Sequence, residues 1–378
     1  MKTKTCRVCR APLYREPLIS YRNMPKAAQF LPGKADLKRE KGVDLDICQC
    51  SGCGLVQLPS APVPYYREVL RAAAFSPEMK KFREAQFSRF VKEYGLRGKK
   101  VLELGCGKGE YLRLMKAAGA DAYGLEYSAA SVAECRKGGL KAERGYLDRK
   151  VKLRGGPFSA FYILNFLEHM PDPVAALSAM RDNLAPGGVG LVEVPDFDMM
   201  LSKNLFSEFI PDHLFYFTRR SLEFLLAASG LEVLKSGTVW HGYILSAEVR
   251  KRAPSDLKGF DGSRRELAAA LKKFTARFGS GGTAVWGAGH QALAVLALAG
   301  LSGKVKYVVD SAPFKQGKYT PATHVPIVPP SALETAPPEA VIVMAASYSD
   351  EVLRLLRRNY PRIRGLAVLR ERGLEVIA

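Results

Sequence analysis

Residues 99–112, KKVLELGCGKGEYL, join a short, mostly apolar run to three glycines at alternating positions. Val101 to Leu104 has the pattern of a buried strand, and a helix-length segment follows the glycines. Gly105, Gly107 and Gly109 let the backbone turn sharply, and they let a ligand approach without interference from a Cβ atom. The stretch therefore predicts a strand, a glycine turn and a helix beside a ligand site.

Three later stretches continue this pattern. Residues 122–126 (AYGLE) predict a second strand that ends in Glu126, an acid placed to accept hydrogen bonds from ribose hydroxyls. Residues 158–173 (FSAFYILNFLEHMPDP) predict a buried strand that runs into polar residues, and residues 184–195 (LAPGGVGLVEVP) predict a turn and another strand. Strands that alternate with helix-length segments predict an α/β domain.

The glycine turn resembles the first motif of class I S-adenosylmethionine (SAM) methyltransferases, because it reads G-x-G-x-G with an acid two residues ahead. LEHMPDP at 167–173 and LAPGG at 184–188 resemble later motifs of that fold, so the resemblance covers roughly residues 95–200. The glycine spacing gives no support to an NAD-type Rossmann domain. The resemblance implies that SAM is bound by these residues: Glu103, Gly105, Gly107, Gly109, Glu126 and Asn165.

The N-terminal segment carries a second kind of site. Five of the seven cysteines lie in the first 53 residues, and four of them form two C-x2-C pairs: Cys6 with Cys9, and Cys50 with Cys53. Two such pairs supply the four soft ligands of a tetrahedral zinc ion. Four thiolates close the coordination sphere, so a structural zinc is expected, and Cys48 is interpreted as a buried strand residue.

Composition bounds the class of protein. A chain of 378 residues has room for two or three domains, and 47% hydrophobic residues indicate a globular protein. The net charge of +20 suggests an anionic partner, but the basic residues are spread along the chain, so a nucleic acid is not the expected partner. The N-terminus has no signal-peptide pattern and no apolar run is long enough to span a bilayer, so we expect a soluble cytoplasmic protein, either a monomer or a small homo-oligomer.

From about residue 253 the chain changes character. A charged, alanine-rich helical stretch leads to GGTAVWGAGHQA at 281–292, which predicts a strand, a G-x-G turn and an apolar helix. Residues 305–310 and 341–345 predict further buried strands, so this part is expected to be a small parallel α/β unit. The turn lacks a third glycine and no clear ribose acid follows. We therefore favour a Rossmann-like unit that shapes a substrate cleft over one that binds NAD.

The order of these three parts resembles the sugar C-methyltransferases, which act on nucleotide-linked keto-deoxysugars. The residues that carry this resemblance are CSGCGLVQL at 50–58, NFLEH at 165–169, DHLFYFT at 212–218 and VVDSAPFKQGKYTPATHVPI at 308–327. It implies a zinc-binding domain at 1–66, a SAM methyltransferase domain at 67–252 and a Rossmann-like substrate domain at 253–378.

Two departures concern the acceptor pocket. The family commonly has a tyrosine two residues before an E-H pair, where this chain has Ile210 and an aspartate, Asp212. The family also tends to carry Y-x-Y-x-S-S before an S-x-x-M motif. This chain has other residues at those tyrosine and serine positions: Val69, Arg71, Ala73 and Ala74. The departures bear on the identity of the sugar and leave the prediction of SAM binding unchanged.

The resemblance implies a reaction in which a base removes a proton beside a ketone and the resulting enolate attacks the SAM methyl group. His213 is the candidate base, because a neutral histidine at pH 7 can accept a proton. Asp212 is expected to orient it or a neighbouring sugar hydroxyl, and His169 to polarise the keto oxygen or to act as the base. The residues expected to bind the substrate are Tyr216, Glu193, Lys315, Lys318 and Tyr319.

Other interpretations of these residues remain open. Either histidine could be a structural, hydrogen-bonded residue, and Lys315 and Lys318 could form a solvated basic turn instead of contacting a diphosphate. The missing tyrosines favour an alternative in which oxygen or nitrogen of a related sugar nucleotide is methylated. The charge and the cysteine pairs allow a third hypothesis, a zinc-ribbon methyltransferase that binds RNA, which predicts strongly salt-dependent RNA binding.

Overall fold

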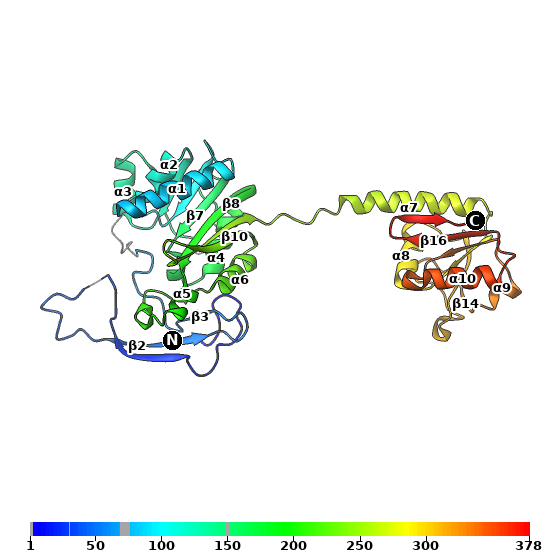
Figure 1. Ribbon diagram of the computed structural model, residues 1–378, viewed down its shortest axis with the longest axis horizontal. Coiled ribbons are helices and arrows are strands. Elements are labelled where there is room, and N and C mark those ends of the chain that lie inside the picture. Colours follow the sequence, from blue (N-terminus) through cyan, green and yellow to red (C-terminus); the bar gives the residue numbers. More distant parts are fainter. Residues whose placement is uncertain (1–2, 30, 69–75, 148–150) are drawn as a thin grey trace. The chain divides into compact units, whose positions relative to one another are not determined.

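A computed structural model describes residues 3–29, 31–68, 76–147 and 151–378 (Figure 1). The chain divides into two compact units, Met1–Ala253 and Pro254–Ala378, and each unit is described by itself. Among the described residues, no helix is both long and apolar enough to cross a membrane.

The larger unit is built on a seven-stranded sheet with the strand order β10-β11-β8-β7-β4-β5-β6. The strands from β4 to β8 pair in parallel, whereas β11 pairs antiparallel with both β8 and β10. The strands are β4 (Lys100–Leu104), β5 (Asp121–Glu126), β6 (Lys141–Arg144), β7 (Phe158–Leu164), β8 (Leu184–Pro195), β10 (Leu231–Val239) and β11 (Ile244–Lys251).

Helices cover both faces of this sheet, because its central strands are apolar on both sides. Val101 and Tyr162 pack with α1, α2 and α3 on one face, whereas Leu102 and Phe161 pack with α4 and α6 on the other (Figure 1). The helices and 3₁₀ turns are α1 (Pro77–Glu93), α2 (Glu110–Ala117), α3 (Ala129–Lys137), η1 (Leu167–His169), α4 (Pro173–Asn183), α5 (Phe197–Ser202), η2 (Phe206–Glu208) and α6 (Arg219–Ala228). This is the three-layer architecture of a class I SAM methyltransferase, and the predicted fold class is confirmed.

The N-terminal segment belongs to the same compact unit and forms a second, four-stranded sheet in the order β1-β2-β3-β9. Its strands are β1 (Ile19–Met24), β2 (Val43–Gln49), β3 (Val56–Gln57) and β9 (Phe215–Tyr216). β3 pairs antiparallel with β9, and the backbone N–H of Leu58 donates to the carbonyl oxygen of Leu214 over 3.0 Å. The segment that carries the cysteine pairs is therefore hydrogen-bonded to the strand that begins two residues after His213.

The smaller unit has a six-stranded sheet in the order β14-β13-β12-β15-β16-β17, parallel except for the last pair. Apolar residues on both faces of this sheet pack against helices, so the unit has its own core. Its elements are α7 (Lys258–Ala276), β12 (Thr283–Trp286), α8 (His290–Leu298), β13 (Val305–Val309), η3 (Pro313–Lys315), β14 (Ile327–Val328), α9 (Ala332–Thr335), β15 (Ala340–Val343), η4 (Ala346–Tyr348), α10 (Ser349–Asn359), β16 (Gly365–Arg370) and β17 (Gly373–Val376). The predicted parallel α/β unit is confirmed.

Candidate active site

The glycine turn between β4 and α2 has the backbone that its sequence requires. Gly105, Gly107 and Gly109 have φ angles of +67°, +52° and +85°, a region that residues with a Cβ atom rarely adopt. A Cβ atom on Gly105 would lie 2.9 Å from the ring of Phe166. Gly105 is therefore packed against Phe166, and Gly105 and Gly107 both line a cavity that a ligand can enter.

Glu126 at the end of β5 holds this turn in place. Its carboxylate accepts hydrogen bonds from the backbone N–H groups of Gly107, over 2.9 Å, and Ser128, over 2.8 Å. The side chain is only 8% exposed. A carboxylate has lone pairs for further donors, so the same group can accept hydrogen bonds from ribose hydroxyls.

One cavity of about 500 Å³ runs from the glycine turn to the predicted acceptor site. Asn165 lies in its wall with a φ of +47°, and its buried Oδ1 atom has no hydrogen-bond partner among the described residues. An unpartnered buried acceptor is costly unless a ligand satisfies it. The open glycine turn, the acid and this acceptor together fit SAM. The residues that the structure brings together around the cavity include Gly105, Gly107, Glu126, Asn165, Glu168, His169, Asp212 and His213.

The two predicted catalytic histidines are neighbours in this wall. Their ring centroids are 4.7 Å apart, and the ring planes meet at 75°. The Nδ1 atom of His169 lies 2.8 Å from the carbonyl oxygen of Asp212. A carbonyl oxygen can only accept, so Nδ1 carries the proton and Nε2 of neutral His169 presents a lone pair.

Burial sets the protonation of this group. It lowers the pKa of His169 to about 4 and, together with the nearby His169, holds the pKa of His213 well below its usual range. The same burial raises the pKa of Glu168 to about 8. Both imidazoles are therefore neutral at pH 7, and the Glu168 carboxyl group holds a proton.

Among the described residues, the Asp212 side chain makes no hydrogen bond to His213, and its predicted role, orienting His213 or a sugar hydroxyl, stays a prediction. The side chain is only 2% exposed, and Oδ1 accepts hydrogen bonds from the backbone N–H of Ala28, over 3.3 Å, and the hydroxyl of Tyr65, over 3.1 Å. The backbone carbonyl of Asp212 orients His169 by accepting a hydrogen bond from it. The carboxylate instead ties the loop to the N-terminal segment.

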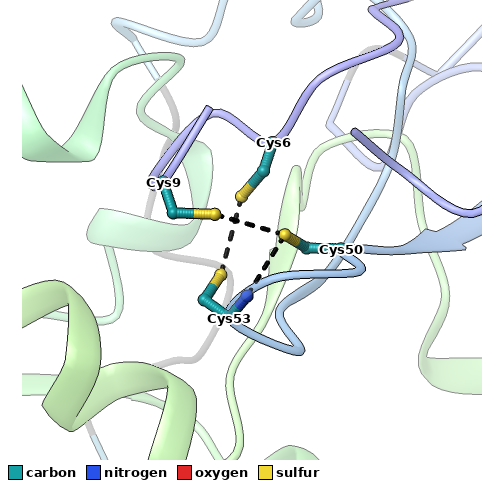
Figure 2. A group of neighbouring side chains, drawn as sticks. All are labelled: Cys6, Cys9, Cys50 and Cys53. Carbon is teal, nitrogen blue, oxygen red and sulfur yellow. Dashed lines mark hydrogen bonds between the residues drawn. The ribbon is translucent and has the colours of Figure 1, made fainter. Parts of the chain in front are cut away.

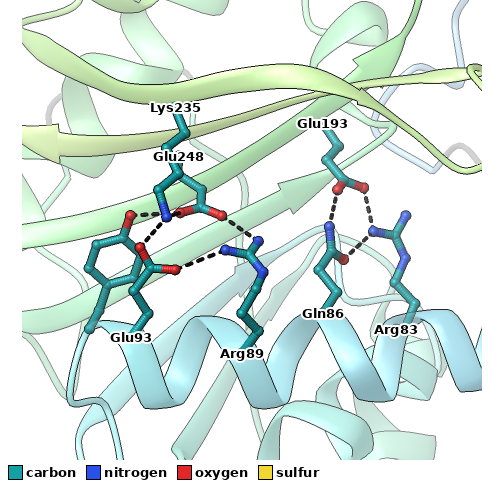
Figure 3. A network of polar contacts seen from close by, with 8 residues as sticks. Arg83, Gln86, Arg89, Glu93, Glu193, Lys235 and Glu248 are labelled. Carbon is teal, nitrogen blue, oxygen red and sulfur yellow. Dashed lines mark hydrogen bonds and ion pairs between the residues drawn. The ribbon is translucent and has the colours of Figure 1, made fainter.

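Two predicted substrate contacts are buried away from the cavity. Tyr216 is 2% exposed, and its hydroxyl donates to the carbonyl oxygen of Ile210 and accepts from the N–H of the same residue. Glu193 is fully buried and binds the side chains of Arg83 and Gln86 on α1 (Figure 3). Both side chains are already engaged within the protein. We therefore assign Glu193 a role in holding α1, and Tyr216 a role in shaping the acceptor loop, which is residues 209–214 between η2 and β9.

Glu103, predicted to contact SAM, is also fully buried, and it accepts a hydrogen bond from the hydroxyl of Tyr162 on the neighbouring strand over 2.9 Å. Among the described residues, neither it nor Gly109 lies in the cavity wall. A Cβ atom on Gly109 would lie 2.5 Å from Leu140, so this glycine permits close packing against that side chain.

The remaining predicted substrate residues lie in the smaller unit. The Lys315 ammonium group pairs with Asp310 at 2.8 Å, and Asp310 also accepts from the backbone N–H of Ala288 in the G-x-G turn over 2.8 Å. Lys318 and Tyr319 are exposed. The positions where the family's tyrosines and serines would stand lie outside the described residues: 69, 71, 73 and 74.

The four N-terminal cysteines converge at one point (Figure 2). The sulfur of Cys6 lies 3.7 Å from that of Cys53, and the sulfur of Cys9 lies 3.3 Å from that of Cys50. All four sulfur atoms lie within 4.8 Å of one another. Four ligands about 2.3 Å from one zinc ion have such separations, so this donor set fits a closed tetrahedral zinc site. Cys48 is a buried residue of β2, as predicted.

Sequence reasoning assigned no role to Glu168, which lines the cavity beside His169. A signal was present, because an ionisable residue directly follows a buried strand and precedes a histidine in LEHMPDP. The ligand atoms of Glu168, His169 and His213 also lie within 4.8 Å of one another. Only the fold brings His213 next to the other two residues, since it lies more than forty positions further along the chain.

Two protein-family models match separate parts of the chain. A family model described as a methyltransferase domain matches residues 79–236, and one described as a C-methyltransferase C-terminal domain matches residues 251–363. The chain is 26% identical over 389 residues to the C-methyltransferase NovU of Streptomyces niveus, a match that covers 92% of this chain and 91% of that protein.

Two further matches cover smaller parts. The ubiquinone biosynthesis O-methyltransferase of Psychrobacter cryohalolentis is 34% identical over 113 residues, which are 27% of this chain and 43% of that protein. Among solved structures, the CcbJ methyltransferase of Streptomyces caelestis is 18% identical with a TM-score of 0.40, and the match covers 50% of this chain and 95% of that chain.

Proposed function

This chain is a SAM-dependent methyltransferase that carries the C-methyltransferase C-terminal domain, and we propose that it methylates the carbon beside the ketone of a nucleoside-diphosphate-linked keto-deoxysugar. The proposal rests above all on one cavity that is lined both by the glycine turn and by two neutral histidines. A carbon beside a ketone becomes nucleophilic only after it loses a proton, so this reaction needs a base near the methyl donor.

Different residues of the chain bind SAM, remove the proton and align the two reacting groups. Gly105, Gly107, Glu126 and Asn165 hold SAM, which supplies an electrophilic methyl group. His213 removes the proton beside the ketone, since its neutral imidazole has a lone pair that can accept a proton. The walls of the cavity align the resulting carbon nucleophile with the methyl group, and this alignment contributes to the rate by itself.

We propose three functional parts: residues 1–66 for zinc, 67–252 for SAM and 253–378 for the nucleotide of the substrate. In the last part, Lys318 and Tyr319 are exposed and available to a diphosphate, whereas Lys315 has to leave Asp310 or contact the ligand while paired. The zinc ion is structural, because four cysteines leave it no open position.

A panel of keto sugars tests the substrate class. The full chain would be incubated with SAM and 4-keto-6-deoxyglucose linked to thymidine, uridine, guanosine or cytidine diphosphate, and mass spectrometry would follow the gain of one methylene unit. We expect one nucleotide to be clearly preferred, and the matching non-keto sugar nucleotides to be unreactive. Equal reaction of the keto and non-keto sugars would contradict the enolate mechanism and favour methylation of oxygen or nitrogen.

A further inference from the structure

Glu168 is a cavity residue that the mechanism above does not use. It lies in η1, which follows β7 and the loop residue Asn165, and its backbone carbonyl accepts from the N–H of Leu214 over 2.8 Å. The side chain is 1% exposed and lines the cavity. Its Oε2 atom is buried and has no hydrogen-bond partner among the described residues. A ligand in the cavity is therefore the natural partner for this oxygen.

No cation compensates this carboxyl group within the described part of the chain. The one ion-pair contact described for it is with His169, whose Nε2 lies 3.9 Å from Oε1. This histidine is itself neutral, as shown above. An ionised carboxylate in such surroundings costs several kcal/mol, so the group retains a proton, and burial raises its pKa to about 8.

Geometry also decides which group can donate to a ketone oxygen. Since Nδ1 of His169 donates to the Asp212 carbonyl, Nε2 has a lone pair and no proton to offer. This excludes neutral His169 as the polarising donor that we predicted. The distance of 3.9 Å from Nε2 to Oε1 is too long for a hydrogen bond, so the Glu168 proton is not committed to His169.

We propose that Glu168 is a catalytic residue that donates its carboxyl proton to the ketone oxygen of the acceptor, an inference that rests on the proposed function. His213 takes the proton from the carbon beside the ketone, and the electron pair of that bond forms the carbon–carbon double bond. The ketone oxygen takes the proton of Glu168. When the new carbon–carbon bond to the methyl group forms, the sulfur keeps the electron pair of the broken bond, the carbonyl re-forms and its proton returns to Glu168. The proton on His213 passes to solvent.

Infrared spectroscopy tests the protonation without any substrate. The spectrum of the wild-type protein minus that of Glu168→Gln at pH 7 should contain the C=O stretching band of a neutral carboxylic acid. Glu266→Gln, which changes an exposed glutamate on α7, should give carboxylate bands instead. The wild-type protein alone provides a second measurement, since the acid band should disappear with a midpoint near pH 8. A difference spectrum with carboxylate bands only would overturn the proposal.

Kinetics with the preferred keto sugar test the catalytic step. Glu168→Gln should lower kcat about 100-fold or more, the usual effect of removing a general acid, while the Kd for SAM stays unchanged. Full turnover by Glu168→Gln would overturn the proposal. So would activation of the wild-type protein, but not of Glu168→Gln, by added Mg²⁺ or Mn²⁺, because Glu168 would then be a metal ligand. If no keto sugar reacts, the proposed function fails, and the infrared result still reports on Glu168 separately.

Discussion

At the scale of single residues, burial reverses the ordinary order of protonation in the acceptor site. In water, a glutamate loses its proton at a lower pH than a histidine does. Here the order is reversed, because the pKa of Glu168 is about 8 and that of His169 is about 4. A carboxyl group that holds its proton and a histidine that stays neutral can act as acid and base at the same pH. His213, also kept neutral by burial, supplies the base.

Replacing His213 tests the base. We expect His213→Gln to lower kcat about 100- to 10,000-fold, because a general base is lost, while the Kd for SAM changes little. Steady-state kinetics and isothermal titration measure the two quantities. His290→Gln is the matched control, since His290 is an exposed histidine at the start of α8. A His213→Gln enzyme with near-full turnover would remove this residue from the mechanism.

The protonation of Glu168 should also appear in the pH dependence of stability. Its pKa rises from about 4.5 in the unfolded chain to about 8 in the folded one, so the stabilisation is fully present below about pH 4.5 and is lost as pH rises through about 8. Across this window, the free energy of unfolding of the wild-type protein should therefore fall by about 1.4 kcal/mol per pH unit relative to that of Glu168→Gln.

Urea unfolding at about pH 5 and pH 7 measures this difference, which we expect to be about 3 kcal/mol. Effects of the other titratable groups cancel when the two proteins are compared, provided that their own pKa values are the same in both. A difference that does not depend on pH would mean that Glu168 is already ionised at pH 5. The charged and titratable groups that share the cavity wall with Glu168 are His169, Asp212, His213, Arg67, Glu68, Lys108, Glu110 and Glu126.

Sequence reasoning found the residues whose roles depend on local structure. Gly105, Glu126 and Asn165 lie at strand ends, where motif spacing alone predicts their positions, and all three line the cavity. Glu193 also lies near the end of its strand, but its side chain binds Arg83, which lies 110 positions earlier in the chain. A local pattern cannot reveal such a partner, and the same applies to Tyr216 and its contacts.

At the scale of elements, the acceptor loop is held between two sheets. β9 follows His213 closely and pairs with β3, which belongs to the N-terminal sheet. The Asp212 carboxylate and the Leu214 carbonyl make further contacts with the N-terminal segment. We therefore expect a zinc ion at Cys6, Cys9, Cys50 and Cys53 to stabilise the acceptor loop indirectly, by ordering the N-terminal segment that contacts it.

Removing the metal tests this connection. We expect one zinc ion per chain by elemental analysis, and its loss in Cys53→Ser but not in Cys48→Ser, the buried strand cysteine. After chelation, hydrogen exchange should rise in β3 and β9, because their pairing depends on the ordered N-terminal segment, whereas β4 and β5 should be unaffected. Equal protection of β9 with and without zinc would show that the two sites are independent.

Helix α1 is fixed to the large sheet by a buried network (Figure 3). Arg83 and Glu193 are both fully buried, and Gln86 bonds to both of them. Replacing one member of such a pair leaves an uncompensated buried charge. We expect Arg83→Met to lower the free energy of unfolding by about 3 to 5 kcal/mol, measured by urea denaturation.

Lys80→Met on the same helix is the matched control, since Lys80 forms an exposed pair with Glu84 and should contribute less than about 1 kcal/mol. If the two variants were equally stable, the buried pair would not be what holds α1 to the sheet. Glu193 would then again be a candidate for the predicted contact with the substrate.

The elements themselves were predictable where they are long or apolar. The strand and glycine turn at 99–112 correspond to β4 and the start of α2, and 305–310 corresponds to β13. The two-residue strands β3 and β9 were not predicted, because so short a strand has no periodicity of its own and exists only through its partner. The pairing of the N-terminal segment with the strand after the acceptor loop could therefore be seen only in the three-dimensional structure.

At the scale of the whole molecule, the chain consists of two units with separate cores. The methyltransferase family model falls in the first unit, and the C-methyltransferase C-terminal model falls almost entirely in the second. The first unit holds the cavity with both the glycine turn and the histidines, so the chemistry that we propose is contained within it.

The position of the transferred methyl group tests the central claim most directly. With SAM labelled by ¹³C in its methyl group and the preferred keto sugar, heteronuclear NMR would identify the atom that carries the label. We predict a methyl group bound to the ring carbon beside the ketone, coupled to that carbon and its neighbours. A label bound to oxygen or nitrogen would contradict the account, because neither product requires the base His213 or the proton of Glu168.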